Sequence, residues 1–378
     1  MSDEEAEMRR VWGAFYGQVI GDALGVTCEF LNVEATTAEI AAVRKKAGRM
    51  SKDSILPMVG CERRGVKAGQ FTDDTEMALS LARSLIAKKD FDKVDVACAY
   101  SFWLCATQPS DSGMTTQNAL RSDIFYNPDT KITPHWRQEL TEEQKHQIFE
   151  TVQKNVQKFN TKSLSNGALM RISPLAIAFR KLSIPQLREI AKADTSLTHA
   201  SPIVADAVAT YCVALAALLK GKNNTEAFDE AFASAETPMV QEYLKDAKTH
   251  DIPIKLFQED FSKPFTVING DGQKQGYIGV AFQSAFYQLL HAKDFASGLE
   301  NAIARGGDTD TNGCIVGALI GARFGVYEIP KEWIDTVKAA EPCRLCLDDS
   351  RKYMDLTFLS IEDVDSLVPK LADVFQAQ

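Results

Sequence analysis

Glycine recurs at every fourth position in the stretch Gly13-Ala-Phe-Tyr-Gly17-Gln-Val-Ile-Gly21-Asp22-Ala-Leu-Gly25. The same spacing returns near the other end of the chain, in Gly313-Cys-Ile-Val-Gly317-Ala-Leu-Ile-Gly321-Ala-Arg-Phe-Gly325. On a helix this spacing lays the glycines along one face. Each interior glycine costs up to about 1 kcal/mol relative to alanine. The pattern therefore predicts buried helices that closely approach a neighbouring backbone or a ligand.

Helical periodicity extends outward from these two stretches over most of the chain. The alternation typical of strands is nearly absent, and 265–269 is the one segment that suggests it. The sequence therefore predicts an all-α fold. The ranges expected to form helices are 11–25, 75–88, 94–106, 142–159, 169–182, 185–193, 202–220, 225–235, 277–290, 295–304, 311–324, 331–340 and 363–378.

No linker rich in proline, glycine or serine divides the chain, so residues 1–378 are expected to form a single domain. Its core is expected over 11–325. The stretch at about 122–162 carries many charges and amides and is interpreted as a polar, solvated insertion. Residues 326–378 are interpreted as a C-terminal helical extension.

Composition excludes several classes of protein. The 378 residues include 42 Lys+Arg against 51 Asp+Glu, a formal net charge of −9. With 45% hydrophobic and 25% charged residues the chain is neither disordered nor a basic nucleic-acid binder. The longest apolar stretches, 207–219 and 314–322, are shorter than the ~20 residues that span a bilayer. The acidic start lacks the features of a secretory signal. We therefore expect a cytoplasmic protein with neither a nucleic-acid nor a membrane partner.

The eight cysteines are scattered and are expected to be reduced thiols. One close pair, Cys343-x-x-Cys346, has no second pair or histidine nearby, which argues against a zinc or redox site.

Two acidic clusters of similar composition stand directly before helices. The first is Thr72-Asp73-Asp74, and the second comprises Asp308, Asp310 and Thr311. One alternative is helix capping, with Asp73 and Glu76 forming a pair like a capping box. Two such clusters exceed what capping needs, and unneutralised carboxylates in a partly buried site would be destabilising. Hydroxyl and carboxylate oxygens suit Mg²⁺ or Mn²⁺, so the pattern favours a dinuclear metal site, with Glu29 as a further candidate.

The motifs resemble those of the ADP-ribosylglycohydrolases, which include dinitrogenase reductase-activating glycohydrolase and the ADP-ribosylarginine hydrolases. They occur in the family's order and cover most of 11–325. The resemblance implies an all-α fold with a binuclear Mg²⁺ or Mn²⁺ centre in a cleft. The motifs are 17–25 with Glu29, Phe71-Thr-Asp-Asp-Thr75, Ser165-Asn-Gly-Ala-Leu-Met-Arg171, Thr198-His199 and Gly306-Gly-Asp-Thr-Asp-Thr-Asn312.

Carried over position by position, the resemblance assigns ligands to both metals. Thr72, Asp73 and Asp74 are similar to the ligands of one ion. Asp308 and Thr311 are similar to the ligands of the other, and Asp310 to the bridging group. Glu29 is similar to a carboxylate that contacts a metal or gates the site.

The resemblance also implies a substrate-binding set. The segment Asp111-Ser112-Gly113-Met114-Thr115-Thr116 resembles a loop around the diphosphate, although an ordinary glycine turn is the alternative. Asn166 and Gly167 are expected to begin a helix whose N–H groups hold phosphate. His199 is expected to bind substrate or support its binders, with a helix-capping histidine as the alternative. Asp308 is predicted to be both a substrate-binding residue and a metal ligand.

Three further residues have open interpretations. Arg171 could pair with phosphate or form a buried structural ion pair. Phe125 and Tyr126 could stack on adenine, but core packing is the more ordinary role for both.

The implied activity is hydrolysis of the bond between mono-ADP-ribose and arginine on a protein, with ADP-ribose as the product. The metals would hold the 2- and 3-hydroxyls of the distal ribose, and Asp73 or Asp74 would serve as general base. Asp310 and Glu29 complete the expected catalytic set. One alternative is cleavage of O-linked ADP-ribosylserine or poly(ADP-ribose). Another is an inactive ADP-ribose-binding relative, against which the presence of all six ligand positions argues. A generic metal-dependent phosphohydrolase is a weaker rival because the five histidines form no His-Asp pair.

Overall fold

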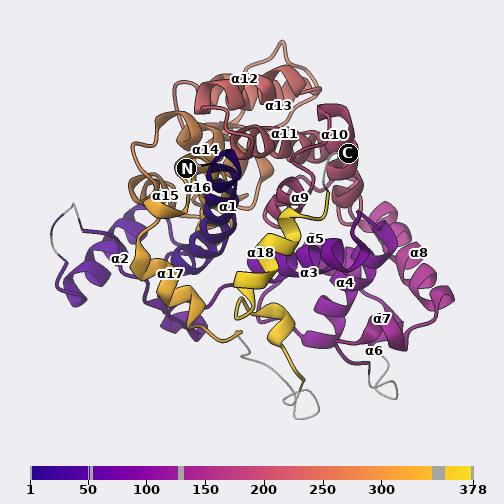
Figure 1. Ribbon diagram of the computed structural model, residues 1–378. Helices are drawn as coiled ribbons and strands as arrows, with labels where there is room; N and C mark the ends of the chain where they lie inside the picture. The colour runs from indigo at the N-terminus through magenta and orange to yellow at the C-terminus, as the bar shows by residue number, and fades with distance from the viewer. Residues whose placement is uncertain (1, 50, 52–53, 127–131, 343–353, 376–378) are drawn as a thin grey trace.

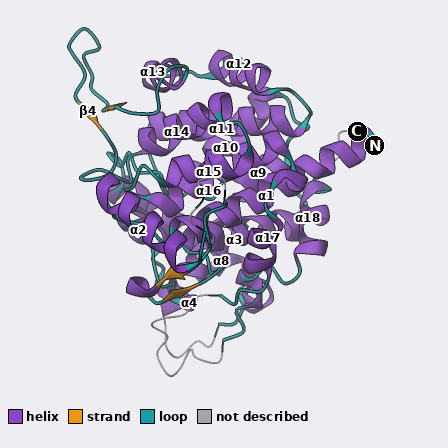
Figure 2. Ribbon diagram, turned by 90° about the vertical axis from the view of Figure 1, so that its left-hand side faces the viewer, coloured by secondary structure: helices purple, strands orange, loops and turns teal. Residues whose placement is uncertain are grey.

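The computed structural model describes residues 2–49, 51, 54–126, 132–342 and 354–375. Helices dominate it, as Figures 1 and 2 show, which confirms the all-α prediction. The α-helices are α1 (Asp3–Gly25), α2 (Val33–Lys46), α3 (Asp73–Lys88), α4 (Lys93–Thr107), α5 (Met114–Leu120), α6 (Asp123–Tyr126), α7 (Trp136–Glu139), α8 (Glu142–Phe159), α9 (Ser173–Ala178), α10 (Ile184–Thr195), α11 (Pro202–Leu219), α12 (Asn224–Ser234), α13 (Pro238–Ala247), α14 (Ile278–His291), α15 (Phe295–Ile303), α16 (Thr309–Phe324), α17 (Lys331–Lys338) and α18 (Val364–Ala372).

Strands are confined, within the described residues, to two antiparallel hairpins of two-residue strands. In the first, β1 (Gly60–Cys61) pairs with β2 (Val66–Lys67). In the second, β3 (Ile254–Lys255) pairs with β4 (Val267–Ile268), which falls within the segment that suggested a strand. Three short 3₁₀ turns complete the described elements: η1 (Glu62–Arg64), η2 (Val326–Glu328) and η3 (Thr357–Leu359).

The helix expected over 169–182 is wrong, because only Ser173–Ala178 is helical there. Proline lacks a backbone N–H and disfavours helical geometry in the residue before it. Pro174 accordingly lies in the first turn of α9, and the preceding residues form turns. Helices α2 and α13 were not expected. In α2 only Thr36 and Val43 are buried, so its apolar periodicity is weak.

The two glycine stretches lie against one another as an antiparallel pair, α1 and α16, which run side by side in Figure 1. A Cβ added to Gly17 would lie 2.0 Å from the carbonyl oxygen of Gly317, and one added to Gly317 would lie 2.0 Å from that of Gly17. Gly13 meets Gly321 and Gly21 meets Gly313 in the same way. The expected tight packing is therefore confirmed, and each stripe is the other's partner.

One hydrophobic cluster of buried residues extends from Val11 to Ala372 and includes the apolar faces of the long helices. Among the described helices, α11 alone is long and apolar enough to cross a membrane, and 89% of it is buried inside the fold. The six cysteines within the described residues are free thiols, all buried, whereas Cys343 and Cys346 lie outside those residues. The expected domain limits, including the insertion at about 122–162 and the extension at 326–378, stay predictions.

Candidate active site

A cleft of about 320 Å³ opens where the N-termini of α3 and α16 meet the C-terminal end of α1. It brings together every predicted site residue except Thr72, Ser112 and His199. Thr116, the last residue of the predicted diphosphate loop, lines it too. It also contains residues to which the sequence assigns no role, namely Phe30, Ser165, Met170, Gln275 and Gly276. The predicted residues that line it are Glu29, Asp73, Asp74, Asp111, Gly113, Met114, Thr115, Asn166, Gly167, Asp308, Asp310 and Thr311.

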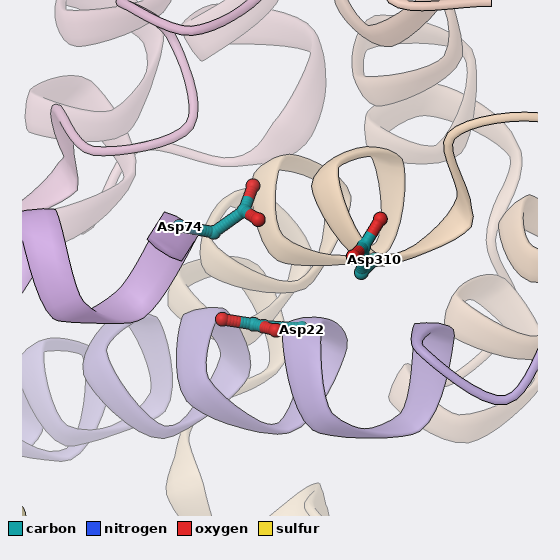
Figure 3. Close-up of side chains that lie close together, drawn as sticks. All are labelled: Asp22, Asp74 and Asp310. Atoms are coloured by element: carbon teal, nitrogen blue, oxygen red, sulfur yellow. The ribbon is translucent and has the colours of Figure 1, made fainter. Parts of the chain in front are cut away.

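Two groups of carboxylates in the site are compact enough to hold a cation. In one, Asp22, Asp74 and Asp310 offer oxygens that all lie within 4.8 Å of one another. In the other, Glu29, Asp308 and Asp310 do the same. Figure 3 shows Asp22, Asp74 and Asp310 converging from α1, α3 and α16. Asp310 belongs to both groups, which is the geometry expected of a bridging residue.

Asp22 was not selected from the sequence as a site residue, yet it ties α3 to α1. Its carboxylate is buried and accepts hydrogen bonds from the backbone N–H groups of Thr72 and Thr75 and from the hydroxyl of Thr72, at 3.0–3.1 Å. The signal that could have found it is a single acid within an apolar, glycine-striped helix, where an unpartnered carboxylate would be costly.

The capping interpretation of the acidic clusters is not realised. Thr72 is the N-cap of α3 and Asp308 is the N-cap of α16, and neither side chain makes a capping hydrogen bond. Glu76 does not reach back to form a capping box, and its carboxylate accepts the indole N–H of Trp103 at 2.7 Å. The acids at both helix starts are therefore free to face the cleft.

Burial gives these acids unusual proton affinities. It raises the pKa of Asp22 to about 6, although hydrogen bonds from Thr75 and Thr72 act in the opposite direction. Burial first, and then the charge of Asp74, raise the pKa of Asp73 well above its usual range. Asp74 and Asp310 are shifted in the same direction by burial and by the neighbouring carboxylates Asp22 and Asp308, respectively. Such a cluster favours protons or metal cations as counter-charge.

Arg64, in η1, is a site residue that no local sequence pattern indicates. Its guanidinium pairs with Glu29 and Asp111, and it lies 3.7 Å from Asp310. It also lies over the ring of Phe30, 5.6 Å from the centroid. The tip of the β1–β2 hairpin thus supplies a cationic side chain to the acidic site.

The segment 111–115 forms one rim of the cleft. Asp111 accepts the backbone N–H of Ser112 at 2.7 Å, and Gln117 donates to the Ser112 carbonyl and hydroxyl at 2.9 Å. Gly113, the N-cap of α5, and Met114 are exposed. This segment is thus a turn fixed by its own polar groups at the cleft mouth.

Asn166 and Gly167 lie in turns and do not begin a helix, so the expected helix start there is wrong. The backbone N–H of Asn166 donates to the carbonyl of Gly276 at 3.0 Å, which removes it as a phosphate donor. The Asn166 amide instead donates to Asp308 at 2.6 Å. Asn166 therefore fixes the orientation of a candidate ligand.

His199 is buried behind the cleft wall. One ring nitrogen lies 2.8 Å from the hydroxyl of Ser165, a cleft residue, and the other lies 2.9 Å from that of Thr198. Burial, with a smaller effect from Arg171, lowers the pKa of His199 to about 3. The ring is therefore neutral and supports Ser165.

Arg171 and Phe125 both have structural roles in the protein core. Arg171 is fully buried and pairs with Asp194 at 3.1 Å, with its guanidinium 4.6 Å from the ring centroid of Tyr100. Phe125 is buried against Phe102. The structure thus favours the buried ion pair for Arg171 and core packing for Phe125, and the side chain of Tyr126 lies outside what the structure describes.

Known proteins resemble this chain over nearly its whole length. The chain is 29% identical over 326 residues to the ADP-ribosyl-[dinitrogen reductase] glycohydrolase of Rhodospirillum rubrum, covering 86% of this chain and 89% of that protein. It is 24% identical over 358 residues to human ADP-ribosylhydrolase ARH3, covering 88% and 90%. It is 25% identical over 339 residues to the ADP-ribosylarginine hydrolase Tri1 of Pseudomonas putida, covering 88% and 75%.

A solved structure described as an ADP-ribosylglycohydrolase-related protein complex has the same fold, with a TM-score of 0.62 at 22% identity. The alignment covers 98% of this chain and 99% of that one. The family model for ADP-ribosylglycohydrolase matches residues 3–366. The chain therefore belongs to the ADP-ribosylglycohydrolase family, whose members hydrolyse ADP-ribosyl linkages.

Proposed function

We propose that the protein hydrolyses the N-glycosidic bond between ADP-ribose and an arginine side chain of a protein, using two Mg²⁺ or Mn²⁺ ions. The observation that carries the proposal is the shared Asp310, which belongs to two groups of carboxylates in one cleft. Thr72 and Thr311 stand beside these acids and add hydroxyl oxygens.

The residues present fit a pair of hard divalent ions. All of the donors are oxygens, which Mg²⁺ and Mn²⁺ prefer. One oxygen of Asp74 is buried and has no hydrogen-bond partner, as a group reserved for a cation would be. Bound there, the ions would supply Lewis acidity toward the 2- and 3-hydroxyls of the distal ribose.

Asp73 is the best candidate for the general base. It lines the cleft and is half-buried, whereas one oxygen of Asp74 accepts the hydroxyl of Thr72 at 2.9 Å. A carboxylate whose pKa is raised, as burial and the charge of Asp74 raise that of Asp73, accepts a proton from water more readily than an ordinary one. Asp73 would orient the attacking water and take its proton, while the Asn166 amide holds Asp308 in position.

The contacts of Arg64 favour an arginine linkage. Asp111 pairs with the Arg64 guanidinium and belongs to neither group of candidate metal ligands, so it can receive the guanidinium of a modified arginine after Arg64 withdraws. The Pseudomonas putida relative is an ADP-ribosylarginine hydrolase, which supports the same choice. The proposed partner is thus an ADP-ribosylated protein and the proposed product is ADP-ribose.

The test is a panel of arginine-linked, serine-linked and polymeric ADP-ribose offered to the purified protein with Mg²⁺ or Mn²⁺. We expect release of ADP-ribose mainly from the arginine-linked substrate, and its loss in excess EDTA. Asp310→Asn should lower turnover by at least about 10³-fold because it removes a charge from both ion positions. Bound metal, counted by elemental analysis, should fall in the same variant.

Asp335→Asn, which neutralises an exposed acid on α17, is the matched control and should keep full activity. Preferential turnover of the serine-linked or polymeric substrate would replace the arginine assignment with the alternative. Binding of ADP-ribose without turnover of any substrate would make the protein an inactive binder. Full activity in excess EDTA would exclude the metal-dependent mechanism.

A further inference from the structure

Residues 254–268 form an arm that projects from the helical body, as the hairpin labelled β4 in Figure 2 shows. Ile254 pairs with Ile268 and Lys255 with Val267, and none of the residues from Lys255 to Asn269 is buried. An isolated two-stranded hairpin is marginally stable in water. The core holds only the base of the arm, where Ile254 is buried and Leu256, Phe265 and Ile268 pack against the core cluster, whereas Phe257 and Phe261 between them are exposed.

The arm exposes apolar side chains where an ordinary surface loop would be polar. Phe257, Phe261 and Val267 are 40%, 38% and 49% exposed. Phe261 packs edge-to-face on Phe265, with 5.3 Å between ring centroids, and the Lys255 ammonium lies 5.4 Å from the Phe265 ring centroid. Exposed apolar residues that cluster in this way mark interaction surfaces.

The base of the arm is continuous with the cleft. The backbone N–H of Phe257 donates to the Tyr277 hydroxyl at 2.8 Å. Gly276, the neighbour of Tyr277, lines the cleft and accepts the backbone N–H of Asn166. A second hollow, of about 430 Å³, is lined by Phe257 and shares Ser165 and Gly276 with the cleft. The arm and the cleft mouth thus adjoin through this hollow.

The mouth itself is also flanked by exposed apolar side chains. Phe30 and Met114 both line the cleft and are 57% and 73% exposed. A cleft of about 320 Å³ accommodates a modified side chain but not the protein that bears it. That protein must therefore lie against the mouth, where Phe30 and Met114 are exposed and from which the arm rises.

We infer that the arm, residues 254–268, is a docking element for the ADP-ribosylated protein and contacts an apolar patch beside the modified residue. This inference rests on the proposed function and names the surface through which its protein substrate is recognised. Neither Phe261 nor Val267 lines the cleft or the second hollow, so both can be changed without touching the residues assigned to chemistry.

The experiment compares two substrates that share the same bond, an ADP-ribosylated protein and free ADP-ribosylarginine. The variant combines Phe261→Ser and Val267→Ser. We expect its kcat/KM on the modified protein to fall at least tenfold, mainly through KM, and its kcat/KM on the free compound to stay within twofold of wild type. The unfolding temperature should be unchanged because neither residue is buried.

Tyr327→Ser is the matched control. Tyr327 is 78% exposed and lies 5.2 Å from the Arg9 guanidinium, in the N-terminal half of α1. Arg9 and Asp22 are 13 residues apart on that helix, which places Tyr327 roughly 20 Å from the acids. Both substrates should be turned over by this variant as by wild type.

The outcomes separate the two proposals. A wild type that hydrolyses neither arginine-linked substrate overturns the proposed function, and the docking inference falls with it. An active wild type whose arm variant is unimpaired on the modified protein overturns the docking inference alone. An equal loss on both substrates does so too, because the arm would then belong to the cleft. A wild-type dimer that the arm variant converts to a monomer, with both activities retained, would make the arm a self-association surface.

Discussion

The Arg64 guanidinium competes with a metal cation for the carboxylates of the acidic site. It belongs to η1, at the tip of a hairpin with two-residue strands, and its side chain pairs with Glu29 and Asp111 and lies near Asp310. A guanidinium so close to a bound divalent ion would be repelled by it, and such repulsion is only partly screened in a half-buried site.

Replacing Arg64 by alanine should therefore strengthen metal binding. We expect the dissociation constant for Mg²⁺ or Mn²⁺, measured by isothermal titration calorimetry, to fall about three- to tenfold in Arg64→Ala. The metal-free variant should also unfold at a lower temperature, because the carboxylates lose their counter-charge. Arg63→Ala is the control, since Arg63 is exposed and donates to the Thr27 carbonyl rather than to the site acids. An unchanged or weaker metal affinity in Arg64→Ala would contradict the prediction.

Single residues were predictable where a local pattern marked them. Asp73, Asp74, Asp308 and Asp310 stand in dense acidic clusters at helix starts, and they do line one cleft. Arg64 could not be found in this way, because an arginine in a loop carries no pattern and its partners lie far along the chain.

The α1–α16 pair is the element on which the spacing of the site depends. Its glycines let the two helices approach until backbone meets backbone, and the pair carries Asp22 on one helix and Asp310 on the other. A side chain at the contact would separate the helices and, with them, two carboxylates that lie within 4.8 Å.

Gly317→Ala should consequently destabilise the fold and weaken the site together. The added Cβ would lie 2.0 Å from the Gly17 carbonyl oxygen, and the backbone of a buried helix cannot move aside locally. Overpacking of this kind costs about 3 kcal/mol or more, measured as the free energy of unfolding in urea. Gly272→Ala, with no atom within 4 Å of the added Cβ, should be close to neutral. If Gly317→Ala and Gly272→Ala had similar free energies of unfolding, the predicted role of the Gly17–Gly317 contact would be contradicted.

The helices that the sequence predicts best are those in which apolar residues recur most regularly. Helix α8 was expected with the limits it has, whereas α2 escaped notice because it buries only two residues. The structure has a turn at Asn166 where the sequence predicts a helix start, because the mostly apolar stretch 168–179 hides Pro174, which delays the helix start until Ser173. The contact between the two glycine stripes depends on tertiary packing, which the spacing of the glycines alone does not predict.

At the scale of the whole molecule, the site joins segments that lie far apart in the chain. Asp22, Asp74 and Asp310 come from α1, α3 and α16, and Asp111 and Asn166 come from the turns between other helices. The order of motifs, through the family resemblance, predicted that these segments meet. The sequence does not predict the arm, because Phe257 and Phe261 look like core residues until the fold leaves them exposed.

Metal should therefore stabilise the entire fold, and it should do so in a pH-dependent manner. The site carboxyl groups have raised pKa values in the folded state, about 6 for Asp22. For such groups the contribution to stability is complete below the unfolded pKa, near 4 for aspartate, and is lost as pH rises through the folded value. The metal-free protein should thus lose the contribution of Asp22 to stability between about pH 4 and pH 7. Divalent ions bind the ionised form and restore stability above that range.

The rise in unfolding temperature on adding Mg²⁺ or Mn²⁺, followed by calorimetry, should accordingly be several degrees at pH 8 and small at pH 5. In Asp310→Asn the rise should be small at both pH values, because a ligand of both ions and one of the mutually repelling charges are removed together. Asp335→Asn should respond as wild type does. An equal metal-induced rise at pH 5 and pH 8 in the wild type would mean that the ions bind elsewhere, and the carboxylates in the cleft would lose their assignment as the metal centre.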